Sequence, residues 1–444
     1  MSFTSFSAVS NINKPDFVQD ISGLLNQDFS EKKILLYARE NNKYGQLFRN
    51  YGDVIAKKYL KAKRYDIIAD MQSTRDFVLE TNKYSYADYT IEDWAIFRKI
   101  LDVDLIIRND RAFRCSIPYV EACEMIYSCT KFMIEFFKIH KYDVVITNMM
   151  DFYVTNIFVR VAEYFNIPVI SFCENAFGLN YIMITKAGEP VYVREPTDLD
   201  VEELYNLIMR KSTPYVLNKK KVYFKAIVNY IKYKVKYCYH YLVLYKLLER
   251  QDYIYRLTGS GTYPRNILNF LKPQSHIFDD ISEIEKLNIG KNIYIPLHYY
   301  PEATTDYWIN HSEYTTYYPS LFEMAKKYAL KGYNVIIKEH TAMFLYRDFK
   351  IYQELKAIEN VYLMSPFITT FDVFKYVDYV LIWTGTTGIE AIIHDKKVII
   401  AYNDPYYAYG KLAHIGHEHE AILFSEKEKK NMIKNILRSY LPII

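Results

Sequence analysis

The sequence predicts an α/β protein of two doubly wound, parallel-sheet domains that face each other across a cleft, for three reasons. The chain has 444 residues, which is too long for a single hydrophobic core. Its first half alternates short apolar runs with helical patterns, and the same alternation begins again after residues 201–280, which lack it. Continuous apolar strands separated by helices are typical of a parallel sheet that is covered on both faces.

The first domain, residues 1–200, is predicted from its strands and the helices between them. An amphipathic helix is expected over 44–60 and a longer one over 117–140. This alternation predicts a Rossmann-like domain. Its strands are expected at 33–38, 65–69, 104–107, 143–147 and 167–172.

A helical connecting region, residues 201–285, separates this domain from a second Rossmann-like domain, residues 286–444. Two such domains facing one another are the GT-B arrangement. Ligands of open α/β sheets bind beyond the carboxyl ends of the strands, so the chemistry is expected there. The second domain is expected to have strands at 292–297, 334–338, 361–363, 379–382 and 397–401, a helix over 319–331 and a terminal helix over 425–440.

Composition and charge place the chain among soluble globular proteins. Half of the residues are hydrophobic and 24% are charged, and no run approaches the ~18 apolar residues of a membrane-spanning helix. The five cysteines form no C-x-x-C pair and indicate reduced thiols. No secretion signal precedes the first domain, so we expect a cytoplasmic protein. The net charge of +4 does not by itself indicate nucleic acid as a partner.

The segment 378–393, DYVLIWTGTTGIEAII, has the pattern of a phosphate-binding turn. A buried strand ends at Trp383, small residues follow, and a helix begins near Gly388. Glycines let the backbone approach a ligand closely, and a helix N-terminus offers free N–H donors to a phosphate. The alternative is an ordinary strand-to-helix turn with a threonine N-cap. The candidate phosphate-binding residues here are Thr384, Gly385, Thr386, Thr387, Gly388 and Glu390.

Two other strand ends of the same domain carry polar residues. Lys338 and His340 end the strand of NVIIKEHT, where a histidine can donate to a phosphate oxygen or offset charge on a leaving group. His298 ends the strand of YIPLHYYPEATTD and precedes a loop that could hold ribose or phosphate or could begin a helix. Three such segments at strand ends of one domain indicate a site. The loop contributes Pro301, Glu302 and Thr304 as candidate donor-binding residues.

The order PLHYYPEATT, KEH and GTTGIEA resembles the capsule polysaccharide biosynthesis glycosyltransferases, which are related to Kdo transferases and distantly to sialyl- and polysialyltransferases. The resemblance covers mainly 286–405. It implies that His340 and the paired hydroxyls of Thr386 and Thr387 bind the phosphate of a CMP-activated sugar, with no metal or other cofactor required. In that family proline normally follows the histidine, whereas here Thr341 does.

An inverting transferase also needs a base that takes the proton of the acceptor hydroxyl. GT-B enzymes supply it from the first domain, residues 1–200, which we therefore expect to hold the acceptor. Glu174 follows the strand at 167–172 and faintly resembles the loop carboxylate of Kdo transferases, so it is the first candidate. Asp151, after the strand at 143–147, is the second. An N-cap or a solvated loop acid is the alternative role for each.

Two further segments invite a functional interpretation. His414–Glu420 is rich in histidine but matches no metal-binding spacing, so no metal is expected.

Residues 219–248 contain eight lysines and no acidic residue, interleaved with tyrosine and phenylalanine. This basic helix fits an anionic membrane surface better than nucleic acid. A helix that packs on its own domain, with its lysines in water, is an alternative of equal weight. Docking would place the protein at the inner face of the membrane.

The sequence therefore predicts an inverting glycosyltransferase of surface polysaccharide synthesis. Its donor is expected to be a CMP-activated acidic sugar such as Kdo or sialic acid, and its acceptor a glycan or lipid-linked saccharide. The alternatives are a GT-B enzyme that uses a UDP sugar, either a transferase or a 2-epimerase, and a non-catalytic carbohydrate-assembly protein.

Overall fold

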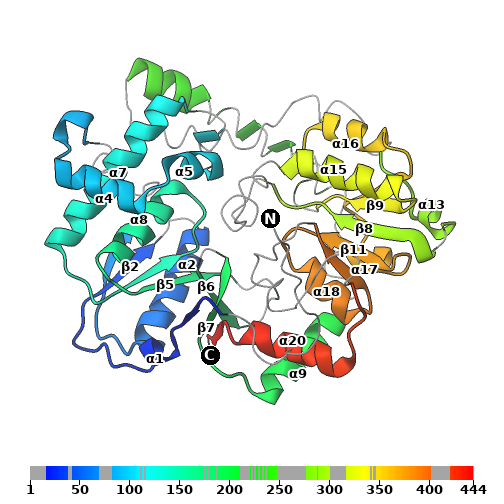
Figure 1. Ribbon diagram of the computed structural model, residues 1–444, viewed down its shortest axis with the longest axis horizontal. Helices are drawn as coiled ribbons and strands as arrows, with labels where there is room; N and C mark the ends of the chain where they lie inside the picture. The colour runs from blue at the N-terminus through cyan, green and yellow to red at the C-terminus, as the bar shows by residue number, and fades with distance from the viewer. Residues whose placement is uncertain are drawn as a thin grey trace, which may run out of the picture.

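The computed structural model describes most of the chain (Figure 1). The first part covers residues 17–38, 43–69, 83–110, 113–114, 117–174, 177, 180–186 and 188–210. The second covers 277–287, 289–300, 317–340, 343, 347–401 and 421–443. Between them it describes residues 221, 224, 227–228, 231–232, 235 and 238–248.

The first domain contains a mixed sheet with the order β1-β7-β6-β5-β4-β2-β3, and β13 also pairs with β6. β2, β3, β4 and β5 are parallel to one another, whereas β6 is antiparallel to both β5 and β7. The strands are β1 Gln19–Asp20, β2 Ile34–Ala38, β3 Asp66–Ala69, β4 Val144–Asn148, β5 Val169–Cys173, β6 Tyr181–Lys186 and β7 Glu189–Tyr192.

The second domain contains a fully parallel sheet with the order β10-β9-β8-β11-β12. All five strands predicted for this domain are present and confirmed. β8 is central and pairs with both β9 and β11, so the chain segments that leave these three strands are neighbours. The strands are β8 Asn292–Pro296, β9 Asn334–Lys338, β10 Val361–Met364, β11 Tyr379–Ile382 and β12 Lys397–Ile400.

Helices cover both faces of each sheet, as Figure 1 shows. Apolar residues of α4, α5, α7 and α8 form one core of the first domain, and those of α1 and α2 form another. The corresponding helices of the second domain are α15 and α16 on one face and α17 and α18 on the other. The helices are α1 Ser22–Leu25, α2 Lys43–Val54, α4 Ile91–Ile100, α5 Val103–Asn109, α7 Tyr119–Ile139, α8 Tyr153–Tyr164, α9 Asp198–Arg210, α13 Ile281–Glu285, α15 Tyr317–Leu330, α16 Phe349–Lys356, α17 Thr370–Phe374, α18 Thr387–Ile393 and α20 Glu426–Leu437.

This architecture confirms the predicted fold class, two doubly wound α/β domains of the GT-B type. One predicted strand, 104–107, is wrong, because these residues lie in α5. Asp102 caps that helix by accepting a hydrogen bond from the backbone N–H of Leu105 (3.0 Å). A short apolar run does not distinguish a strand from a buried helix turn, whereas a capping aspartate favours the helix.

The end of the chain returns to the first domain, although it lies within residues 286–444, which the sequence predicts as the second domain. α20 packs with α9 and α18 in a core that also contains residues of the second sheet. β13, Tyr440–Pro442, then pairs antiparallel with β6, with Tyr440 opposite Met183. The chain therefore connects the two domains both through α9 and through the segment from α20 to β13.

Candidate functional site

Three segments that the sequence singled out meet at one edge of the second sheet. His298 follows β8, His340 follows β9, and Thr384 follows β11. Because β8 lies between β9 and β11, the three ends are adjacent. Thr384 Oγ1 lies 3.5 Å from His298 Nδ1, and His340 is close enough to influence the protonation of His298.

The turn between β11 and α18 approaches His298 closely. Gly385 has a φ of +116°, a backbone conformation that favours glycine. A Cβ atom at Gly385 would lie 3.5 Å from His298 Cε1. Gly388 has a different role, since a Cβ atom there would collide with Ile382 of β11. Gly385 thus permits the backbone conformation of the turn, and Gly388 lets α18 pack on the sheet.

The hydroxyls of the turn differ in their surroundings. Thr384 is buried, whereas Thr386 and Thr387 are half-buried. Thr386 is the N-cap residue of α18, but its side chain makes no capping hydrogen bond. α18 has only seven residues, so its dipole is a small part of any attraction for a phosphate. The hydroxyl and histidine side chains would therefore contribute more to phosphate binding than the helix terminus.

A backbone hydrogen bond holds His298 in place, and its imidazole ring is uncharged at neutral pH. Its N–H donates to Tyr317 Oη (2.9 Å). Burial lowers the pKa of the ring to about 3, and the charges of His340 and Arg347 act in the same direction. Its Nε2 atom is buried and has no hydrogen-bond partner among the described residues. A neutral histidine with such an atom can bind a polar ligand group.

His340 lies next to the aromatic ring of Tyr299, with 5.7 Å between the ring centroids. Its side chain is accessible to solvent. The surrounding protein nevertheless lowers its pKa to about 4, chiefly by desolvation and further through Lys338 and Arg347, while Glu339 opposes the shift. Both histidines of the site are therefore neutral at pH 7 and can act as hydrogen-bond donors.

Lys338 brings a positive charge to the same edge of the sheet. Its side chain is only 7% exposed, and its Nζ donates to the carbonyl oxygen of Glu339 (3.3 Å). Burial lowers its pKa to about 8, and Glu339 and Glu390 partly offset this. Strand alternation places Lys338 on the face of β9 that packs toward α18, which carries Glu390.

A buried ion pair between Glu339 and Arg347 underlies both histidines, and sequence reasoning missed its role. Arg347 Nε donates to Glu339 Oε2 (2.7 Å), and both side chains are 0% exposed. Arg347 also donates to the carbonyl oxygen of His298 (2.8 Å). The sequence signal is slight: an arginine eight residues after a glutamate that ends a strand.

The candidate bases lie at neighbouring strand ends of the first sheet. Glu174 directly follows β5 and is exposed to solvent. Asp151 lies between β4 and α8 and is buried. Since β4 pairs with β5, both carboxylates belong to one edge of that sheet. Solvent access favours Glu174 as the group that an acceptor hydroxyl could reach.

Several predicted residues lie outside the part of the chain that the structure describes. Pro301, Glu302 and Thr304 fall between the described ranges 289–300 and 317–340. The histidine-rich segment 414–420 falls between residues 401 and 421. These predictions stay predictions.

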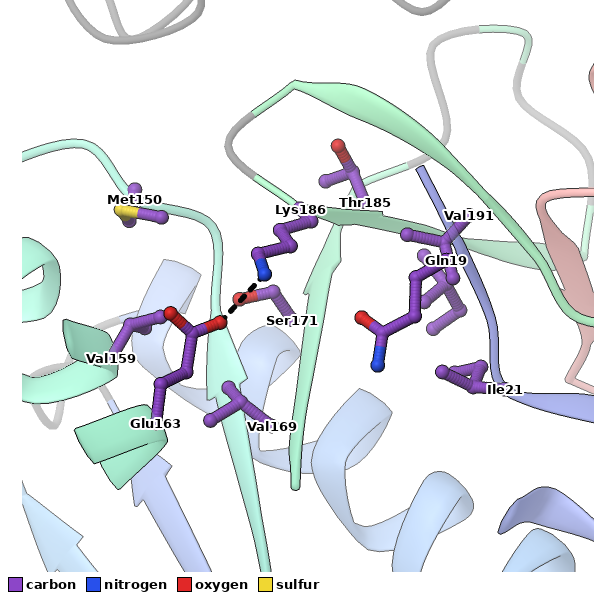
Figure 2. A pocket seen from close by; sticks show the side chains of 11 residues that line it. Gln19, Ile21, Met150, Val159, Glu163, Val169, Ser171, Thr185, Lys186 and Val191 are labelled. Atoms are coloured by element: carbon purple, nitrogen blue, oxygen red, sulfur yellow. Dashed lines mark ion pairs between the residues drawn. The ribbon is translucent and has the colours of Figure 1, made fainter. Parts of the chain in front are cut away.

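A small pocket lies on the first sheet, among β5, β6, β7 and α8 (Figure 2). Lys186 and Glu163 form an ion pair across it (2.8 Å). Ser171 lines it, and the buried Ser171 Oγ has no hydrogen-bond partner among the described residues. The pocket is formed by the first domain alone and is separate from the three strand ends of the second sheet.

Comparison with known proteins finds one family model that matches the second half of the chain. Residues 274–442 match the family described as capsule polysaccharide biosynthesis protein. This supports a role in glycan biosynthesis. No curated protein matches the chain in sequence.

Solved structures that match most of the chain share little sequence with it and have low TM-scores. One is UDP-GlcNAc 2-epimerase from Neisseria meningitidis, at 17% identity over 90% of each chain and a TM-score of 0.27. The corresponding enzyme from Methanocaldococcus jannaschii is 12% identical over 93% of this chain and 95% of its own, with a TM-score of 0.24. An apo structure of OtsA is 10% identical over 92% and 96%, with a TM-score of 0.32.

Proposed function

We propose that this chain, whose residues 274–442 match the capsule polysaccharide biosynthesis family, is an inverting glycosyltransferase. Its donor is a nucleotide sugar, with a CMP-activated acidic sugar favoured, and its acceptor is a glycan or lipid-linked saccharide. One observation carries the proposal: His298, His340 and the turn 384–387 meet at the carboxyl edge of a parallel sheet.

The chemistry of this edge suits a donor phosphate. Hydroxyl groups and neutral histidines offer hydrogen bonds to phosphate oxygens, and Lys338 offers a positive charge. When the bond between sugar and phosphate breaks, negative charge grows on the departing nucleotide. Donors already in place stabilise that charge without reorganisation, which lowers the barrier.

The first domain supplies the base in this proposal. Glu174 takes the proton of the acceptor hydroxyl while the acceptor oxygen attacks the anomeric carbon. The attack comes from the side opposite the nucleotide, the bond to the phosphate oxygen breaks, and the configuration inverts. The nucleotide leaves with the electron pair of the broken bond, and we propose no metal or further cofactor for this step.

The donor is tested by thermal shift and calorimetric titration with CMP, UDP, GDP and TDP. We expect CMP to stabilise the protein and to bind most tightly. His340→Ala should weaken CMP binding by about ten- to a hundredfold, the effect of losing a hydrogen bond to a charged group.

His140→Ala is the matched control, because His140 is an exposed histidine of the first domain. It should leave CMP binding unchanged. Stabilisation by UDP and not CMP would overturn the choice of donor, and conversion of a UDP sugar without an acceptor would indicate an epimerase. No response to any nucleotide would contradict a nucleotide-sugar enzyme.

We also propose that the basic segment 219–248 docks on an anionic bilayer at the cytoplasmic face. Phe224, Ile227, Ile231 and Val235 recur at helical spacing, and all four side chains are exposed. Lysines of the same segment would add about 1 kcal/mol each near anionic lipid. None of the helices in the described part of the chain is long and apolar enough to cross a bilayer.

Co-sedimentation with vesicles of phosphatidylglycerol and phosphatidylcholine tests this docking. We expect binding at low salt that weakens at high salt and disappears in a Phe224→Ser/Ile231→Ser/Val235→Ser variant. Leu330→Ser, which changes an exposed leucine of the second domain, should bind like the wild type. Absence of binding at low salt ends the proposal.

A further inference from the structure

The backbone ladder between β8 and β9 ends just before the two histidines. Its last hydrogen bond runs from the N–H of Leu297 to the carbonyl oxygen of Lys338 (3.0 Å). Beyond this point the two chain segments need other partners, because unpaired backbone groups in a protein interior are costly. His298 and His340 lie in that stretch.

Side chains replace the missing ladder. Arg347 Nη2 donates to the carbonyl oxygen of His298 (2.8 Å). Glu339 Oε1 accepts from the backbone N–H of His340 (2.5 Å). Arg347 and Glu339 are themselves joined by two hydrogen bonds, Nε to Oε2 (2.7 Å) and Nη2 to Oε1 (3.0 Å). One ion pair therefore connects the backbones of the two histidines.

Neighbouring tyrosines complete this network. Tyr352 donates to Glu339 Oε2, and Tyr318 Oη accepts from Arg347 Nη1 (2.9 Å). The carboxylate of Glu339 thus accepts four hydrogen bonds, and the guanidinium of Arg347 binds on three sides. Because Glu339 and Arg347 are each held by several hydrogen bonds from different directions, the network favours one geometry.

Stability alone does not account for an ion pair in this place. Removing two charges from water is costly, and apolar residues of similar volume are often as stabilising as a buried pair. What apolar residues cannot do is bind the His298 carbonyl and the His340 N–H at the same time. The geometry of the two histidines is the property that only the ion pair supplies.

We propose that Glu339 and Arg347 are positioning residues, which hold His298 and His340 at the separation that a donor phosphate requires. The proposal rests on the proposed function, because it assigns these histidines to the donor. Neither Glu339 nor Arg347 needs to touch the donor. Their effect passes through the backbone of the two histidines.

The test compares a double variant, Glu339→Leu/Arg347→Met, with a matched control. Asp93→Leu/Lys131→Met removes a buried ion pair of the first domain, in which Lys131 Nζ lies 2.9 and 2.8 Å from the Asp93 oxygens. We measure unfolding temperature, CMP affinity by calorimetry, and the split between kcat and KM.

We expect the site variant to lose CMP affinity by about ten- to a hundredfold while it remains folded, because small misplacements of binding groups are costly. The control should keep CMP affinity within about twofold, whatever its unfolding temperature. Arg347→Lys keeps the charge, but an amine cannot make both the paired hydrogen bonds to Glu339 and the bond to the His298 carbonyl. We therefore expect an intermediate loss of CMP affinity.

Wild-type CMP affinity and turnover in the folded double variant would overturn the proposal. If that variant does not fold, wild-type affinity in Arg347→Lys overturns it instead. NMR titration of the histidines separates this outcome from a failure of the proposed function. A loosened network should let water reach His298 and raise its pKa toward 6.5, whether or not any nucleotide binds.

Discussion

The charge of the candidate site depends on Lys338 more than on its histidines. His298 and His340 have pKa values of about 3 and about 4, so neither changes its charge near neutral pH. Lys338 has a pKa of about 8 and is the cation that titrates in this range. A bound phosphate would favour the charged form of the amine and would therefore raise that pKa.

This predicts the pH dependence of nucleotide binding. Below pH 8 Lys338 already carries its proton, so CMP affinity should change little between pH 7 and 8. Above pH 8 binding must take up a proton, and affinity should fall by about tenfold per pH unit. Calorimetric titration from pH 7 to 9.5 measures this slope.

The variant Lys338→Met tests whether Lys338 is the group that causes this fall in affinity. The variant should bind CMP more weakly at pH 7 and should show no fall above pH 8. An identical slope in the wild type and in Lys338→Met would mean that another group titrates, and that Lys338 does not face the phosphate.

At the scale of elements, the strands of the second domain were predictable because each is a continuous apolar run between turn residues. The observed sheet order brings the ends of three of these strands, and with them His298, His340 and Thr384, together. The sequence also marked Gly385, since a chain with only 13 glycines keeps them where backbone conformation requires them.

The partners of these residues could not be predicted in the same way. Arg347 lies neither in a strand nor at a strand end, and only the fold carries its guanidinium back beneath His298. α5 was mistaken for a strand because burial, not periodicity, dominates a seven-residue helix. Local patterns specify elements, whereas contacts between distant segments depend on tertiary packing.

At the scale of the whole molecule, the end of the chain joins the two domains. α20 shares a core with α9 and α18, while β13 belongs to the first sheet. Arg194 Nε donates to the carbonyl oxygen of Tyr440 (2.9 Å), and Arg438 pairs with Glu195 (2.9 Å). A rigid connection on this side would keep an acceptor base and a donor site in register.

Substitution of Leu441 tests this connection. Leu441 in β13 is 1% exposed and packs in the core of the first domain, so Leu441→Ala should lower the free energy of unfolding by about 2–5 kcal/mol. Leu423→Ala, at a leucine that is 55% exposed, should change it by less than about 0.5 kcal/mol.

Because β13 belongs to the first sheet and not to the donor site, CMP affinity should survive in both variants while transfer slows in Leu441→Ala alone. Calorimetric unfolding and transfer assays measure the two effects, and unchanged transfer in Leu441→Ala would show that β13 does not hold the two domains in register.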